Sequence, residues 1–141
     1  MAQLRELVEA ELENIERTVA GLPDSSLLSS LSPLELAGVA ALIHNFYNGA
    51  ENILKQIVIS RGKEPTCGPS WHRDLVNIAA SDGIISQSTG KELRRYLAFR
   101  HFFSHGYSFD LDQERVIPLV KDIGGVLVSF RSEITKAIKE T

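Results

Sequence analysis

The feature that most constrains the fold is one long helical repeat in the first half of the chain. Apolar residues recur there every three or four positions, which places them on one face of an α-helix. They are Ile43, Phe46, Tyr47, Ala50, Ile53, Leu54, Ile57 and Val58. Just before them, Ser32 can cap a helix, Pro33 suits its first position, and Glu35 completes a capping box. We therefore predict a helix that runs to about Ser60 and forms the backbone of the fold.

Both ends of the chain also repeat at helical spacing. The first apolar stripe comprises Leu4, Leu7, Val8, Leu12, Ile15 and Val19. The last helix is expected over roughly residues 113–138, and its inward residues are Ile117, Val120, Leu127, Ile134 and Ile138. Pro118 and the pair Gly124-Gly125 interrupt this last helix, which implies a late start, a kink or a close contact with another helix.

Two shorter helices are expected between these long ones. Ser70 can cap a helix through "WHRDLVNIAAS" that ends near Gly83. A further helix begins at Ser86 or Ser88, and Gly106 is placed to end it in a left-handed conformation. No alternating strand pattern competes with these helices. We therefore predict an all-α, antiparallel bundle of four to five helices.

Size and composition agree with one globular domain over residues 1–141. A chain of 141 residues with 43% apolar and 23% charged residues can bury its own core. The single cysteine, Cys67, excludes an internal disulfide and favours a reducing, cytoplasmic location. No early segment reads as a signal peptide, and the longest apolar runs are too short to span a bilayer, so no membrane partner is expected. The net charge of −3 gives no global basic field for nucleic acid.

Positive charge is nevertheless concentrated in one stretch. Lys91, Arg94, Arg95 and Arg100 stand against only Glu92 in the helix that leads to "FRHFFSHGYSFD". A locally basic helix in an acidic protein is compatible with phosphate contact at one place. The alternative reading is an ordinary solvated helix face.

Arg100 occupies an apolar position of this helix. The other members of the same seam are Leu93, Tyr96, Leu97 and Phe103. Burying an unpaired guanidinium is costly, so Arg100 should meet a carboxylate, a phosphate or a wet cleft. Glu51, on the long helix, is a candidate partner on polarity alone.

Phe99 and Phe102 lie off that seam, so the helix is apolar on more than one side. A helix of this kind is usually buried on both sides, and in a small bundle a second subunit most easily covers the extra side. We therefore predict a homodimer in which the helix that carries Arg100 lies at or near the interface.

Two histidines follow Arg100. His101 and His105 are four residues apart and share one helical face. His105 stands in the expected last turn, where the helix dipole favours a protonated ring, and an imidazole exchanges protons near neutral pH. An alternative reading of the same pair is a zinc site, with Asp110 or Asp112 as a third ligand.

Arg100, His105 and Tyr107 form the pattern R-x4-H-x-Y. This pattern resembles the signature of the HEPN superfamily, and specifically that of HepT-like ribonuclease toxins from HEPN/MNT toxin–antitoxin systems. "HNFYNGAENILK" (44–55) and "WHRDL" (71–75) are similar to stretches of the same family, so the resemblance spans roughly residues 35–120. Ser104 departs from it, because many relatives carry a basic residue there, and this lowers the expected affinity for RNA or rate of cleavage.

The resemblance implies a metal-independent endoribonuclease without a cofactor. Arg100 would clamp the phosphate, for which its planar fork is suited, and His105 would act as the acid/base that draws a proton from a ribose 2′-hydroxyl. His101, Ser104 and Glu51 are expected to support this site. Transfer RNA is the substrate class that the resemblance favours.

The resemblance also implies how the activity is neutralised. In relatives, the tyrosine that corresponds to Tyr107 receives AMP from an MNT nucleotidyltransferase antitoxin. A permanently anionic phosphodiester two residues from His105 would engage Arg100 and obstruct RNA. Without the motif, Tyr107 would be read as a tyrosine that packs its loop onto the bundle.

A non-catalytic HEPN module, which binds a nucleotide or serves as the docking half of a two-chain nucleotidyltransferase, is the second functional alternative. Ser104 and the acidic pI near 5.8 favour it, whereas the intact Arg100 and His105 oppose it. The other histidines, His44 and His72, are interpreted as hydrogen-bonded structural residues.

Overall fold

The computed structural model describes residues 2–64, 71–104 and 113–141, and within these ranges the protein is all-helical. The predicted fold class is confirmed: a HEPN-like helical bundle without strands in the described residues. The helices are α1 (Ala2–Ala20), a 3-10 helix η1 (Ser25–Ser30), α2 (Pro33–Ser60), α3 (Trp71–Ser81), α4 (Gln87–Ser104) and α5 (Gln113–Lys139).

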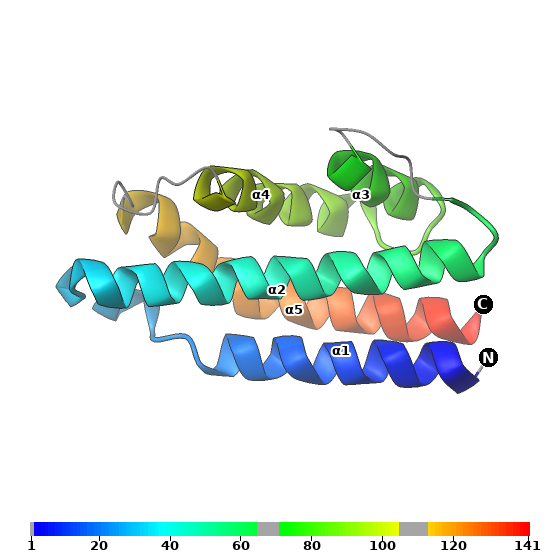
Figure 1. The fold of residues 1–141 in the computed structure, drawn as a ribbon, viewed down its shortest axis with the longest axis horizontal. Coiled ribbons are helices and arrows are strands. Elements are labelled where there is room, and N and C mark those ends of the chain that lie inside the picture. Colours follow the sequence, from blue (N-terminus) through cyan, green and yellow to red (C-terminus); the bar gives the residue numbers. More distant parts are fainter. Residues whose placement is uncertain (1, 65–70, 105–112) are drawn as a thin grey trace.

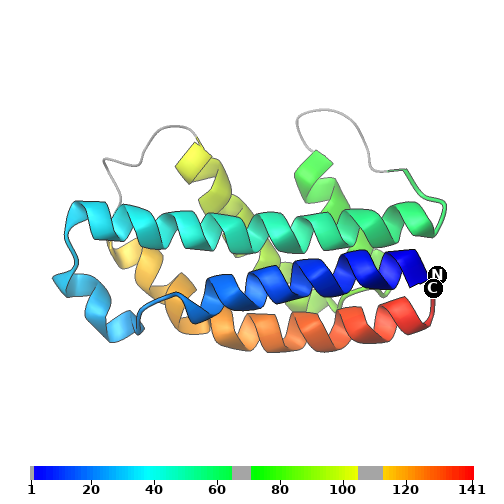
Figure 2. The same ribbon diagram turned by 60° about the horizontal axis from the view of Figure 1, so that its bottom comes forward.

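The helices form two groups on either side of α2. Figures 1 and 2 show α1, α2 and α5 side by side along the length of the molecule, with both termini at one end. The helices α3 and α4 pack on α2 and on each other, and α4 also contacts α5. Figure 2 shows the beginning of α3 and the end of α4 on the same side of the molecule. The central helix thus carries α1 on one side and α3 with α4 on the other.

The predicted beginning and end of α2 are confirmed. The Ser32 side chain accepts a hydrogen bond from the Glu35 backbone N–H at 3.1 Å, and the Glu35 carboxylate accepts one from the Ser32 N–H at 3.0 Å. Pro33 occupies the first turn, and the helix ends at Ser60. All eight residues of the predicted stripe are buried. This apolar face supplies the largest part of the core, which is how burial rather than propensity stabilises a long helix.

Of the predicted stripe, the first helix buries Leu4, Val8, Leu12 and Ile15, and it partly buries Val19. Leu7 is 50% exposed, because the contact with α2 uses a narrower face than the sequence pattern suggested. The two helices approach closely at Gly49. A Cβ atom at this position would overlap the side chain of Ile15 on α1. Only a residue without a side chain fits here, and the sequence analysis did not identify this contact.

Pro118 and the pair Gly124-Gly125, which were expected to interrupt the last helix, affect α5 differently. The helix begins at Gln113, so Pro118 lies inside it and a late start is excluded. In Figures 1 and 2 the first, gold part of α5 runs at an angle to the remainder, as expected where proline removes a helical hydrogen bond. Gly124 and Gly125 are exposed and have no neighbour within 4 Å of a built Cβ, so they mark no close helix contact.

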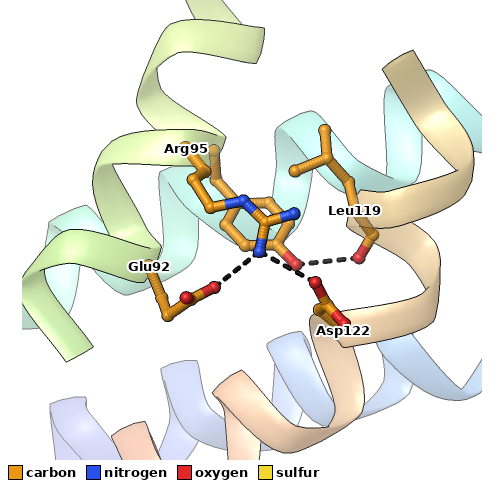
Figure 3. A network of polar contacts seen from close by, with 5 residues as sticks. Glu92, Arg95, Leu119 and Asp122 are labelled. Carbon is orange, nitrogen blue, oxygen red and sulfur yellow. Dashed lines mark hydrogen bonds and ion pairs between the residues drawn. The ribbon is translucent and has the colours of Figure 1, made fainter. Parts of the chain in front are cut away.

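Polar contacts fix α4 against α5 (Figure 3). The Tyr96 hydroxyl is buried and donates a hydrogen bond to the Leu119 carbonyl at 2.8 Å. The Arg95 guanidinium joins Glu92, on its own helix, to Asp122 on α5, at 2.6 and 2.9 Å. These partners raise the pKa of Arg95, since both carboxylates favour the charged form. The start of α4 is capped by Ser86, whose hydroxyl accepts from the Thr89 N–H at 3.0 Å.

One premise of the dimer prediction is wrong. Phe99 is 5% exposed and belongs to the core of this single chain, so it needs no second subunit to cover it. The side chains of Phe102 and Phe103 lie outside the described part of the chain. The homodimer therefore stays a prediction.

No helix in the described ranges has the length and the apolar composition that crossing a membrane requires.

Candidate functional site

The predicted site residues fall partly inside the described ranges. The side chains of Arg100, His101 and Glu51 are described, whereas His105, Tyr107 and the side chain of Ser104 lie outside. Gly106, the predicted end of the fourth helix, and Ser70, the predicted cap of the third, lie outside as well. The site is therefore built here from Arg100 and from the groups around it.

Arg100 lies in the last turns of α4 and is half-buried against α2. Its Nε donates a hydrogen bond to the Asn48 side-chain oxygen at 3.0 Å. This neutral acceptor holds the stem of the guanidinium and does not itself neutralise the positive charge. Among the described residues, no carboxylate forms an ion pair with Arg100.

The expected pairing of Glu51 with Arg100 is wrong. Glu51 is buried, 8% exposed, and its carboxylate lies 2.8 Å from Nδ1 of His72 at the beginning of α3. A buried carboxylate needs a partner, and a histidine at this distance satisfies that requirement. The interpretation of His72 as a hydrogen-bonded histidine is confirmed.

A tryptophan holds the ring of His72 from one side. The centroids of the Trp71 and His72 rings are 3.7 Å apart with an interplanar angle of 34°. The Lys55 ammonium lies 5.8 Å from the centre of the Trp71 ring, a cation–π distance. The imidazole is therefore held both by a neighbouring aromatic ring and by a hydrogen bond.

These contacts all fall on one stripe of α2, here called the polar strip. It comprises His44, Tyr47, Asn48, Glu51 and Lys55, spaced by three or four residues so that they share a face. Asn48 reaches Arg100 on α4, and Glu51 reaches His72 on α3. The sequence pattern predicted the apolar face of α2, but not that a polar strip beside it binds both neighbouring helices.

The polar strip is electrostatically coupled to Arg100. Burial lowers the pKa of His44, the Arg100 charge lowers it further, and Glu51 opposes both. Burial raises the pKa of Tyr47, and the Glu51 charge adds to this effect, while Arg100 counters it. The Tyr47 hydroxyl is buried and makes no well-formed hydrogen bond within the described residues, although the neighbouring Glu51 carboxylate raises its pKa.

A groove of about 400 Å³ opens between α3 and α4 beside Arg100, here called the basic groove. It is lined by His72, Arg73, Arg94, Leu97, Ala98, Arg100 and His101. Three of the seven are arginines, two are histidines and none is acidic. Arg94 is held in place by Asn77, whose side-chain oxygen accepts from its Nε and from a terminal nitrogen at 3.1 and 2.8 Å.

The composition of the basic groove suits an anion with a planar or branched set of oxygens. Guanidinium groups donate in a fixed fork that matches phosphate, and low screening in a groove strengthens the attraction. Arg94 and His101 are spaced along α4 so that both line the groove, whereas His72 and Arg73 line it from α3. The sequence predicted phosphate contact on one basic helix, α4. The structure adds basic residues of a second helix, α3, which the sequence pattern alone did not indicate.

Within the described ranges, no group of three or more histidine, cysteine, aspartate or glutamate side chains is arranged to hold a metal ion. The zinc alternative rests on His105, Asp110 and Asp112, which lie outside those ranges, so it is not tested by this arrangement.

Comparison with known proteins gives one family. No curated protein matches the chain. A family model described as HepT-like protein matches residues 38–141, which include the polar strip, the basic groove and the R-x4-H-x-Y pattern. Because this match covers well over half of the sequence, the chain belongs to the HepT-like family, a HEPN family whose members are generally ribonucleases of toxin–antitoxin systems.

Proposed function

We propose that this protein is the toxin of a bacterial toxin–antitoxin system and acts in the cytoplasm as a metal-independent endoribonuclease. The observation that carries the proposal is the position of Arg100. Its guanidinium is half-buried, and Asn48 holds it through Nε. Among the described residues, Arg100 has no carboxylate partner, and the groove that it lines has no acidic residue. A scissile phosphate supplies the negative charge that this arrangement lacks.

The reaction follows from the motif and from the groove. His105, five residues after Arg100, removes the proton of a ribose 2′-hydroxyl. The 2′-oxygen then forms a bond to phosphorus, and the bond from phosphorus to the 5′-oxygen breaks. Arg100 stabilises the extra negative charge of the pentacoordinate phosphorus. The products are a 2′,3′-cyclic phosphate and a 5′-hydroxyl, and transfer RNA is the favoured substrate class.

Tyr107 is the proposed control point. A cognate MNT nucleotidyltransferase transfers AMP to its hydroxyl, and this reaction places a permanent negative charge two residues from His105. The new phosphate competes with RNA for Arg100 and the basic groove. Tyr107→Phe should therefore keep ribonuclease activity and escape neutralisation by the antitoxin.

A non-catalytic HEPN module is the second candidate. Ser104 stands where many relatives carry a basic residue, and the chain is acidic, with a pI near 5.8. Both features weaken attraction for an RNA backbone. In this case the basic groove would hold a single nucleotide or a docking surface for a nucleotidyltransferase, and Arg100 would bind without catalysing.

Incubation of the purified protein with total RNA in EDTA separates the two candidates. We expect cleavage by the wild type and a loss of about 10²–10⁴-fold in His105→Ala, since a positioned proton-transfer group contributes that much. Lys136→Ala, which removes a positive charge from the exposed surface of α5, is the matched control and should cleave like the wild type. Folded wild-type protein that leaves RNA intact both with and without EDTA would support the module. Stoichiometric zinc in the purified protein, with cleavage abolished by EDTA, would support the zinc alternative.

A further inference from the structure

The basic groove contains a histidine, His72, that is paired with the buried Glu51 and does not belong to the R-x4-H-x-Y motif. His72 belongs to α3, and Glu51 to α2, and neither helix carries a residue of the motif. His72 lines the groove together with Arg100 and His101. A histidine that shares a groove with the proposed phosphate clamp is within the region that the substrate would occupy.

The contact with Glu51 defines which ring nitrogen of His72 is available. A carboxylate accepts hydrogen bonds and cannot donate them when ionised, so Nδ1, at 2.8 Å from Glu51, carries a proton. The other nitrogen, Nε2, has no hydrogen bond within the described residues and is left to exchange protons. This is the arrangement in which a carboxylate fixes the tautomer and the orientation of a histidine that transfers protons.

The ring is also held rigidly enough to act on a substrate. Glu51 is 8% exposed and lies on the central helix α2, and the tilted Trp71 ring lies against the imidazole with the ring centroids 3.7 Å apart. The side chain of His72 remains 22% exposed, so it is neither sealed in the core nor free on the surface. Catalytic groups need this combination of fixed orientation and access.

Cleavage by the 2′-hydroxyl requires two proton transfers. One group removes the 2′ proton, and another must give a proton to the 5′-oxygen as its bond to phosphorus breaks, because an alkoxide is a poor leaving group. The proposed function assigns the first transfer to His105 and leaves the second without a donor. His72 lines the groove, and a buried carboxylate, that of Glu51, orients it.

We infer that His72, held by Glu51, is the second catalytic residue, the acid that gives the Nε2 proton to the 5′-oxygen. This inference rests on the proposed ribonuclease function. As the bond from the 2′-oxygen to phosphorus forms and the bond to the 5′-oxygen breaks, His105 gains one proton and His72 loses one. Arg100 keeps its charge on the phosphate, and solvent later restores both histidines. Glu51 is a positioning residue, since it acts through His72.

The test compares two leaving groups on one short oligoribonucleotide that contains the mapped cleavage site. In the first substrate the leaving atom is oxygen, and in the second it is a 5′-bridging sulfur, which departs as a thiolate and needs no proton. His72→Asn keeps an N–H near the position of Nδ1 but cannot transfer a proton. We expect it to lose about 10²–10⁴-fold on the oxygen substrate and to return to within roughly tenfold of the wild type on the sulfur substrate.

Further variants separate catalysis from structure. Arg100→Ala should stay inactive on both substrates, because it acts on the phosphate and not on the leaving group. Glu51→Gln should lower kcat more than it raises KM, by less than His72→Asn does. The pH profile of kcat/KM, bell-shaped in the wild type, should lose its alkaline limb in His72→Asn. Thermal melts and Lys136→Ala control for folding and for lost surface charge.

The outcomes distinguish this inference from the proposed function. Active wild type with an equally active His72→Asn variant overturns the role of His72 alone. A His72→Asn variant that is equally impaired on both substrates, with an unchanged bell-shaped profile, also overturns it and indicates a structural histidine. Wild-type protein inert toward RNA overturns both proposals. Selective rescue by the sulfur leaving group is the result that the acid role predicts.

Discussion

At His44, the charges of Arg100 on α4 and of Glu51 in the polar strip act on the pKa in opposite directions. Burial lowers the pKa of its imidazole, Arg100 lowers it further, and Glu51 only partly compensates. The folded protein therefore binds a proton at His44 less readily than the unfolded chain, whose ordinary value is 6.5. A group whose pKa is lower in the folded state stabilises the fold while it is neutral, and this stabilisation is lost as it becomes protonated.

We therefore expect the free energy of unfolding to fall as the pH decreases from 7 toward 5. The contribution of His44 is fully present above its unfolded pKa of 6.5 and disappears as the pH falls through the lower folded value. His44→Gln should flatten this pH dependence, measured by urea unfolding at several pH values. Asn45→Gln, an exposed neighbour without a titratable group, should keep the wild-type dependence. An unchanged slope in His44→Gln would contradict the lowered pKa of His44.

At the scale of the helices, alanine substitutions at two glycines of α2 should change the free energy of unfolding in opposite directions. Gly49 faces α1, where an added Cβ would overlap Ile15, whereas Gly38 is exposed and has no neighbour within 4 Å of a built Cβ. Alanine favours a helix over glycine by about 1 kcal/mol, and overfilling a packed contact costs about 1–3 kcal/mol. Gly38→Ala should therefore raise the free energy of unfolding by about 0.5–1 kcal/mol. Gly49→Ala should lower it by up to about 2 kcal/mol, because the gain in helix propensity offsets only part of the cost of the overlap.

Chemical denaturation of both variants tests this pair, because the same substitution in the same helix differs only in its surroundings. If Gly49→Ala were as stable as Gly38→Ala, α1 would pack on α2 less closely than the structure has it. Circular dichroism of the native state controls for a loss of helix in either variant.

Local patterns predicted the helices well because caps and apolar spacing act within one helix. The capping box of Ser32 and Glu35 and the end of α2 follow from local hydrogen bonds. Leu7 and Gly49 could not be predicted in the same way, since their exposure and contacts depend on how α1 approaches α2. The surroundings of Gly124 could not be predicted for the same reason: only the packing of the helices shows that no described residue lies within 4 Å of a Cβ built there.

For the whole molecule, the site was predictable in its residues but not in its pairings. Arg100 stands out because it interrupts an apolar seam, and that argument needs only one helix. Its partner Asn48 is 52 positions away in sequence, and Glu51 binds His72 instead. Polar residues of α2 can pair with either α3 or α4, so only the packing of three helices decides between them.

The assembly of two chains is the prediction that concerns the molecule as a whole. We propose a homodimer in which α4 lies at or near the interface, so light scattering at micromolar concentration should give about twice the 15.6 kDa of one chain. Because Phe99 is buried in its own chain, this interface is not needed to cover an apolar side chain there. The reason to expect it is instead a catalytic site to which both subunits contribute residues. Five residues along a helix correspond to a rotation of about 140°, so Arg100 and His105 of one chain would point in different directions. In a dimer, Arg100 of one subunit and His105 of the other can form one site.

Mixing two inactive variants tests this arrangement directly. Arg100→Ala and His105→Ala should each fail to cleave RNA. If each site combines Arg100 of one chain with His105 of the other, dimers formed by unfolding and refolding the two variants together contain one intact site and one doubly defective site. Statistical mixing makes half of the dimers mixed, so the pool should recover about one quarter of the wild-type sites. Sites built within one chain would recover nothing, and a monomeric mass in light scattering would exclude the shared site altogether.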